Sequence, residues 1–184
     1  GDRPLVFASD AISMLALVLI VLNATAMLAM PYLVWIMASG FVGDERFDLT
    51  VFFGRIAFPY IIFISLAALA SGVLNSAGRF VAAAAAPVLL NICFIAALFA
   101  ADWAGWNVGL TLAWCVPVAG VAQFAFVWFA AHRAGFTLIP RLPRMTPELS
   151  RLAMIAAPAA LAGGVVQVNL VVGRQIASYF DGAN

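Results

Sequence analysis

Charged residues are scarce in this chain, and lysine is absent. Only 9% of its 184 residues are charged, whereas a soluble domain usually carries about 25%. Nine arginines and eight acidic side chains cannot cover the surface of a water-soluble globule. The net charge of +1 provides no basic field for phosphates. The composition therefore excludes a soluble domain, a disordered tail and a nucleic-acid-binding protein.

Groups that perform catalysis or bind metals are equally sparse. Cys93 and Cys115 lie in apolar runs and form no CxxC pair, so we interpret them as small core side chains. His132 is the single histidine and lies beside Arg133, and no Asp, Glu or His lies inside an apolar run. We therefore predict that the chain is not an enzyme and has no catalytic residue, metal site or cofactor.

Apolar runs make up most of the sequence, which is 66% hydrophobic and has a mean hydropathy of +1.09. Five of them lie between charged residues, and each exceeds the roughly 20 residues that cross about 30 Å of hydrocarbon. They cover residues 11–43, 56–78, 80–101, 103–131 and 152–173. None alternates as a barrel strand does. The sequence therefore predicts an all-α bundle of five membrane-spanning helices.

Local signals predict where several helices begin and end. Asp48 is expected to cap a helix that starts at the next residue, which places Arg55 inside that helix. The N-S-A-G sequence at 75–78 is typical of a turn and predicts an antiparallel hairpin. The T-P-E sequence at 146–148 has the chemistry of a helix start, so the last helix is expected to begin at Pro147.

Arginines gather at one end of the predicted bundle. Six lie on the side of the N-terminus, the 75–80 turn and the 132–151 loop, namely Arg3, Arg79, Arg133, Arg141, Arg144 and Arg151. Because cytoplasmic loops carry the excess of basic residues, we expect the chain to begin in the cytoplasm. The 132–147 stretch contains three prolines and three arginines. It predicts a hinge-like cytoplasmic linker, whose arginines either belong to an ordinary, stiff positive-inside loop or contact lipid headgroups.

Each predicted helix also contains a proline and most contain a polar residue. The prolines are Pro31, Pro59, Pro87, Pro117 and Pro158, and they are either ordinary membrane-helix prolines or bending points of a transporter. The polar side chains are Asn23, Asn91, Gln123, Gln167 and Asn169. At membrane depth such groups face protein or a wet cavity.

Three of these residues on the last helix are candidates for a substrate cavity. Gln167 and Asn169 lie two residues apart and so face different ways on the helix, which means that at most one is expected to line a cavity. Arg174 follows five residues later. Its guanidinium either reaches outward to the membrane surface or faces a cavity as an anion site.

Distinctive motifs fill the middle third of the chain: F-P-Y at 58–60, G-V-L-N-S-A-G-R-F at 72–80 and A-P-V-L-L-N at 86–91. Together they closely resemble the MurJ (MviN) family of bacterial lipid II flippases, with weaker similarity at 157–169. The residues that carry the resemblance, to which we assign structural roles, are Arg55, Pro59, Asn75, Gly78, Arg79, Pro87, Asn91 and Pro158. The family is similar in fold to multidrug, oligosaccharidyl-lipid and polysaccharide exporters, which have fourteen helices in two lobes.

The resemblance implies that this chain is an internal fragment, matching helices three to seven. The absence of an initiator methionine agrees with that expectation. Residues 1–131 would then be the latter part of the N-terminal lobe, residues 132–147 a cytoplasmic linker, and residues 148–184 the first long helix of the C-terminal lobe. The family's cavity arginines, suited to a pyrophosphate, would lie on helices outside this chain.

The implied function is transport of lipid II from the cytoplasmic to the periplasmic leaflet of the bacterial inner membrane by alternating access. The implied partners are lipid II and membrane lipids, with cell-wall synthesis proteins as further candidates. One alternative is another exporter of the same superfamily, such as a polysaccharide-lipid flippase or a cation-coupled drug antiporter. The other is a membrane scaffold that transports nothing.

Overall fold

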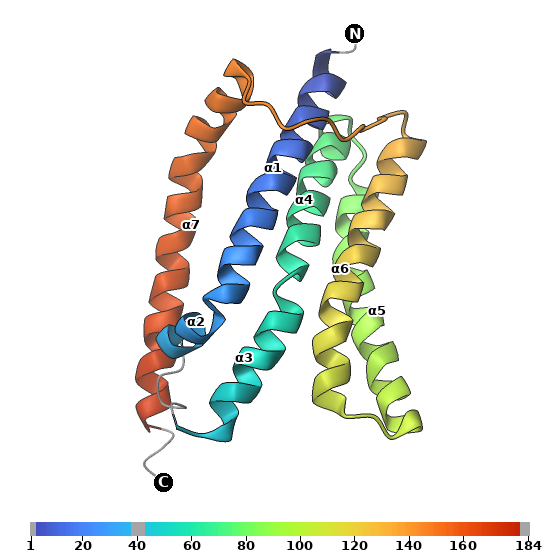
Figure 1. Ribbon diagram of the computed structural model, residues 1–184. Coiled ribbons are helices and arrows are strands. Elements are labelled where there is room, and N and C mark those ends of the chain that lie inside the picture. Colours follow the sequence, from blue (N-terminus) through green and yellow to red (C-terminus); the bar gives the residue numbers. More distant parts are fainter. Residues whose placement is uncertain (1–2, 38–42, 181–184) are drawn as a thin grey trace.

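The computed structural model describes residues 3–37 and 43–180, and within them the side chains of all but 165–166 and 174–180. This part of the chain forms seven helices (Figure 1): α1 (Arg3–Leu28), α2 (Met30–Met37), α3 (Glu45–Ala57), α4 (Tyr60–Ser76), α5 (Val81–Ala104), α6 (Val108–Arg133) and α7 (Pro147–Phe180). Five segments are long and apolar enough to cross a membrane, with α3 and α4 together making one of them. The predicted all-α bundle with five spans is confirmed.

The predicted start of the helix capped by Asp48 is wrong. The cap of α3 is Asp44, one turn before Asp48, and the Asp44 side chain accepts a hydrogen bond from the backbone N–H of Arg46 at 3.3 Å. The extended backbone of Asp44 lets the helix start there, and Asp48 then lies in the first turn, where a negative charge is favourable. Helix α1 begins at Arg3, eight residues before the apolar run that starts at residue 11.

The predicted run 103–131 also starts too early, because its first residues end the preceding helix. Gly105 closes α5 with a left-handed backbone, φ +67°, and the Asn107 side chain caps α6 by accepting from the N–H of Leu110 at 2.9 Å. By contrast, α7 begins at Pro147 as predicted. The hydroxyl of Thr146 accepts from the N–H of Leu149 at 3.2 Å and provides its cap.

The turn predicted at 75–78 is confirmed. Gly78 adopts φ +74°, which a side chain would disfavour. The N–H of Arg79 donates to the carbonyl of Leu74 at 3.0 Å, and the N–H of Gly78 donates to the carbonyl of Asn75 at 3.0 Å. This pair of bonds satisfies the last carbonyls of α4 and turns the chain into the antiparallel α5.

The prolines fall into two structural groups. Pro31 and Pro59 lie at or next to interruptions: Pro31 is the second residue of α2, just after the break at Ala29, and Pro59 lies between α3 and α4. Pro87, Pro117 and Pro158 instead lie inside α5, α6 and α7, which continue through them. The predicted single run 11–43 is therefore two helices rather than one.

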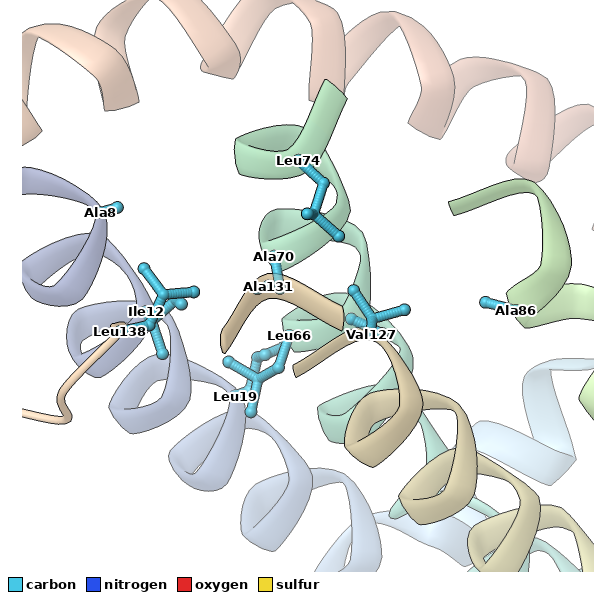
Figure 2. Close-up of a cluster of buried hydrophobic side chains, with 11 residues drawn as sticks. Ala8, Ile12, Leu19, Leu66, Ala70, Leu74, Ala86, Val127, Ala131 and Leu138 are labelled. Carbon is cyan, nitrogen blue, oxygen red and sulfur yellow. The ribbon is translucent and has the colours of Figure 1, made fainter. Parts of the chain in front are cut away.

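A tightly packed body is formed by α1, α4, α5 and α6, with α4 and α6 at its centre. Figure 2 shows its main cluster, in which side chains from α1, α4 and α6 converge and Leu138 joins them from the linker. Small residues allow close approach: Ala70 of α4 and Ala119 of α6 are fully buried, and a Cβ at Gly120 would lie 2.8 Å from Cδ2 of Tyr60.

Helix α7 stands apart from this body. Leu149 is its only buried residue among the side chains described, and its closest neighbours are α1 at one end and α2 at the other. The start of α1, the α4–α5 turn and the linker before α7 all lie at the same end of the molecule (Figure 1). The six arginines counted above therefore gather at one end of the bundle, in or near its turns and helix ends.

Candidate functional site

A groove separates α2 from α7 and contains one of the three predicted cavity residues. It has a volume of about 460 Å³ and is lined by Leu33, Ile36 and Met37 from α2 and by Gln167 and neighbouring valines from α7. We call it the α2–α7 groove. Almost all of the surface that lines the groove is apolar, so the groove suits an apolar group such as a hydrocarbon chain.

The structure does not bring the other two predicted residues into this groove. Asn169 is exposed on α7 and does not line the groove. Arg174 belongs to α7, but its side chain lies outside the described residues. The prediction of a substrate role for these three residues stays a prediction.

A second hollow lies at the arginine-rich end, between the first turns of α1 and α7. Its volume is about 820 Å³, and its polar lining consists of Arg3, Asp10, Thr146 and Glu148. An adjoining hollow of about 440 Å³ shares Asp10 and Thr146 and adds two arginines of the linker. Because both carboxylates and guanidinium groups line these two hollows, they suit a ligand that carries both charges better than a simple anion.

Two of the polar residues inside the helices face protein. Gln123 of α6 is buried, and its Nε2 donates to the carbonyl of Ala86 on α5 at 2.8 Å. Asn23 is half-buried, and its Nδ2 contacts Sδ of Met27 at 3.3 Å within α1. Asn91 of α5, in contrast, is exposed. Gln123 therefore joins two helices.

The residues of the family-like motifs have clear positions. Arg55 lies in the last turn of α3, and its Nε donates to the carbonyl of Met27 in α1 at 3.1 Å. Asn75, Gly78 and Arg79 form the α4–α5 turn at the surface. The remaining motif prolines lie at the α3–α4 interruption (Pro59), in α5 (Pro87) and in α7 (Pro158).

The sequence did not reveal the importance of two serines on α1. Ser9 and Ser13 are buried one turn apart, and their hydroxyls accept hydrogen bonds from the N–H groups of Ile139 and Arg141 at 3.2 and 2.8 Å. These bonds attach the linker to α1. The available signal was the four-residue spacing of two hydroxyls in an otherwise apolar helix.

Groups of side chains that could bind a metal ion are not found in the described part of the chain. Within residues 3–37 and 43–180, no three His, Cys, Asp or Glu side chains come close enough to hold a metal ion. Cys93 is half-buried and Cys115 is buried, and both are free thiols.

Comparison with known proteins agrees with the motifs in the sequence. The family model described as "Lipid II flippase MurJ" matches residues 2–183. The chain is 46% identical over 182 residues to "Probable lipid II flippase MurJ" of Rhizobium tropici and 43% identical over 182 residues to the protein of that name in Rhizobium meliloti. Each alignment covers 96% of this chain and 34% of the relative.

A third relative is "Lipid II flippase MurJ" of Burkholderia cenocepacia. It is 40% identical over 176 residues, which are 92% of this chain and 34% of the relative. The chain thus spans about a third of the length of the curated relatives it matches. On the match of the family model over nearly its whole length, the chain belongs to the lipid II flippase MurJ family.

Proposed function

We propose that the protein to which this chain contributes moves lipid II from the cytoplasmic to the periplasmic leaflet of the bacterial inner membrane. The observation that carries this proposal is the family match over residues 2–183. The chemistry makes a protein path necessary, because a polar headgroup cannot cross hydrocarbon unaided. Two bodies that enclose a polar cavity and open it to each side in turn would solve this problem while the lipid tail stays in the bilayer.

The arrangement of the helices supports a division into two bodies. Helices α1 to α6 pack together, whereas α7 leaves nearly all its described side chains exposed. We assign residues 1–131 to the N-terminal lobe, residues 132–147 to the linker between lobes and residues 148–184 to the start of the C-terminal lobe. The open sides of α7 are then available to the rest of the longer protein.

The α2–α7 groove is our candidate for part of the transport path. Gln167 is one of the residues that line it, and its apolar walls suit the hydrocarbon part of a lipid-linked molecule. We retain Asn169 and Arg174 as further candidates on the same helix. The arginine-rich end would face the cytoplasm, following the usual distribution of basic residues.

Depletion of the full-length protein in living cells tests this function. We expect lipid II to accumulate on the cytoplasmic leaflet and to become inaccessible to an impermeant lipid II-cleaving enzyme added outside. Normal exposure of lipid II after depletion would contradict the proposal. Accumulation of another lipid-linked sugar would favour a different exporter, and rescue by a variant that cannot transport would favour a scaffold.

A further inference from the structure

Two interruptions of the helices lie side by side, and each leaves a backbone carbonyl without its helical donor. Pro31 has no N–H, so the carbonyl of Met27, four residues earlier, loses the hydrogen bond that an α-helix would supply. Pro59 does the same to the carbonyl of Arg55. Such a carbonyl is costly inside a membrane unless another group supplies a donor.

The side chain of Arg55 supplies the missing donor at the first interruption. Its Nε lies 3.1 Å from the carbonyl oxygen of Met27, although the two residues are 28 positions apart. Arg55 follows the first residue of α3 by ten positions, which corresponds to about 15 Å along the helix. At that distance from the helix end, a guanidinium favours a protein partner over hydrocarbon. Arg55 therefore takes part in both interruptions: its carbonyl lacks a donor because of Pro59, and its side chain supplies the donor that Pro31 denies to Met27.

Apolar packing joins the two helices beyond these interruptions. Met30 and Val34 of α2 form a buried cluster with Val51 of α3. Gly54, next to Arg55, leaves room for the thioether of Met30, because a Cβ at position 54 would lie 3.0 Å from its Sδ. This cluster fixes α2 against α3, and the hydrogen bond from Arg55 fixes α3 to the last turn of α1, so the angle between α1 and α2 is held through α3.

The position of α2 in turn determines one wall of the α2–α7 groove. Leu33, Ile36 and Met37 project from α2 toward the side of α7 that carries Gln167. A change in the angle between α1 and α2 would move these three side chains relative to α7. The interruption at Pro31 allows that change, and the bond between Arg55 and Met27 opposes it.

We infer that Arg55 is a positioning residue that holds α3 to the end of α1, so that α3 and the α2 helix packed against it keep their place as one wall opposite α7 during transport. This inference rests on the proposed function. Arg55 does not touch the groove itself, and it acts through the carbonyl of Met27 and the orientation of α2. Its loss should leave substrate binding intact and slow the conformational step.

Electron-spin distances in the full-length protein test the inference. In a variant without native cysteines, Leu170→Cys on α7 is paired with Trp35→Cys on α2 or with Leu49→Cys on α3, because all three side chains are exposed. With Arg55→Met, we expect the α2–α7 distance distribution to become at least twice as broad while the α3–α7 distribution stays unchanged. An α2–α7 distance distribution of equal width with Arg55 and with Arg55→Met would overturn the inference.

Two further variants separate positioning from a general loss of charge. Arg46→Met removes an arginine of the same helix that pairs with Asp44 at the surface, 3.4 Å away, and should leave both distributions unchanged. Arg55→Lys retains a donor and should keep the α2–α7 distribution narrow. A broad distribution in Arg46→Met or in Arg55→Lys would contradict the specific role of the hydrogen bond to Met27.

A second pair of measurements covers a failure of Arg55→Met to fold and a failure of the proposed function. Adding Pro31→Ala restores an N–H for the carbonyl of Met27, so the double variant should fold even where Arg55→Met does not. No recovery of folded protein would contradict the inference.

For transport, we expect Arg55→Met to lower the rate of lipid II movement at least fivefold with unchanged binding of lipid II. If the unmodified protein moves no lipid II, the proposed function fails, while the distances still decide the role of Arg55.

Discussion

The backbone N–H of Arg141 donates a 2.8 Å hydrogen bond to the hydroxyl of Ser13, which lies 128 residues earlier in the chain. That hydroxyl in turn donates to the carbonyl of Ser9 at 2.8 Å, and the hydroxyl of Ser9 accepts from Ile139. Leu138, the residue just before these contacts in the linker, is buried in the main cluster. The first part of the linker is therefore fixed to α1, and we expect bending between the two bodies to occur at residues 142–146.

Removing the serine hydroxyls should release this part of the linker. In the full-length protein with Ser9→Ala and Ser13→Ala, we expect the amides of Ile139 and Arg141 to exchange hydrogen about fivefold faster, since a hydrogen bond contributes about 1 kcal/mol. Hydrogen exchange followed by mass spectrometry measures this rate. Thr25→Ala is the control, because that hydroxyl bonds only within α1, to Val21. Equal exchange in both proteins would refute the attachment.

Gly120 should not tolerate a side chain. Its missing Cβ would lie 2.8 Å from Cδ2 of Tyr60 and 3.2 Å from Cβ of Phe63, so Gly120→Ala must displace the Tyr60 ring or shift α6 relative to α4. We expect a loss of stability of about 1–3 kcal/mol, as for other overpacked cores, visible as a lower midpoint of thermal unfolding in detergent. Gly72→Ala has no atom within 4 Å of the new Cβ and should be neutral or slightly stabilising. The same midpoint for both variants would contradict the packing described.

The orientation in the membrane can be tested at two turns at opposite ends of the bundle. In intact cells that express a cysteine-free full-length protein, we expect an impermeant thiol reagent to modify Trp106→Cys and not Arg79→Cys. The reason is the concentration of arginines at the end that carries position 79. Modification of position 79 alone would mean that the orientation is reversed.

The sequence predicts the helices better than it predicts the contacts between them. The apolar runs identify the five spans, and the N-S-A-G sequence identifies the α4–α5 turn, because both depend on neighbouring residues. Pro31 interrupts a helix and Pro87 does not, although both lie in apolar runs. That difference depends on tertiary packing, which a local pattern does not contain.

At the candidate site, too, the sequence predicts a residue from its local surroundings but not the residues that lie opposite it. The sequence selects Gln167 because an amide at membrane depth needs a partner. It gives no sign that Leu33, Ile36 and Met37 lie opposite, since they are more than 120 residues away in the chain. The roles of Ser9 and Ser13 were missed for the same reason, because their partners come from a distant linker.

Transport of lipid II by the purified full-length protein is the most direct test of the central claim. The protein is reconstituted into vesicles that carry labelled lipid II only in the inner leaflet, and an impermeant reagent added outside reports the label that reaches the outer leaflet. We predict that lipid II becomes accessible in vesicles with the protein and stays protected in vesicles without it. Equal protection in both would contradict the assignment of lipid II transport to this protein.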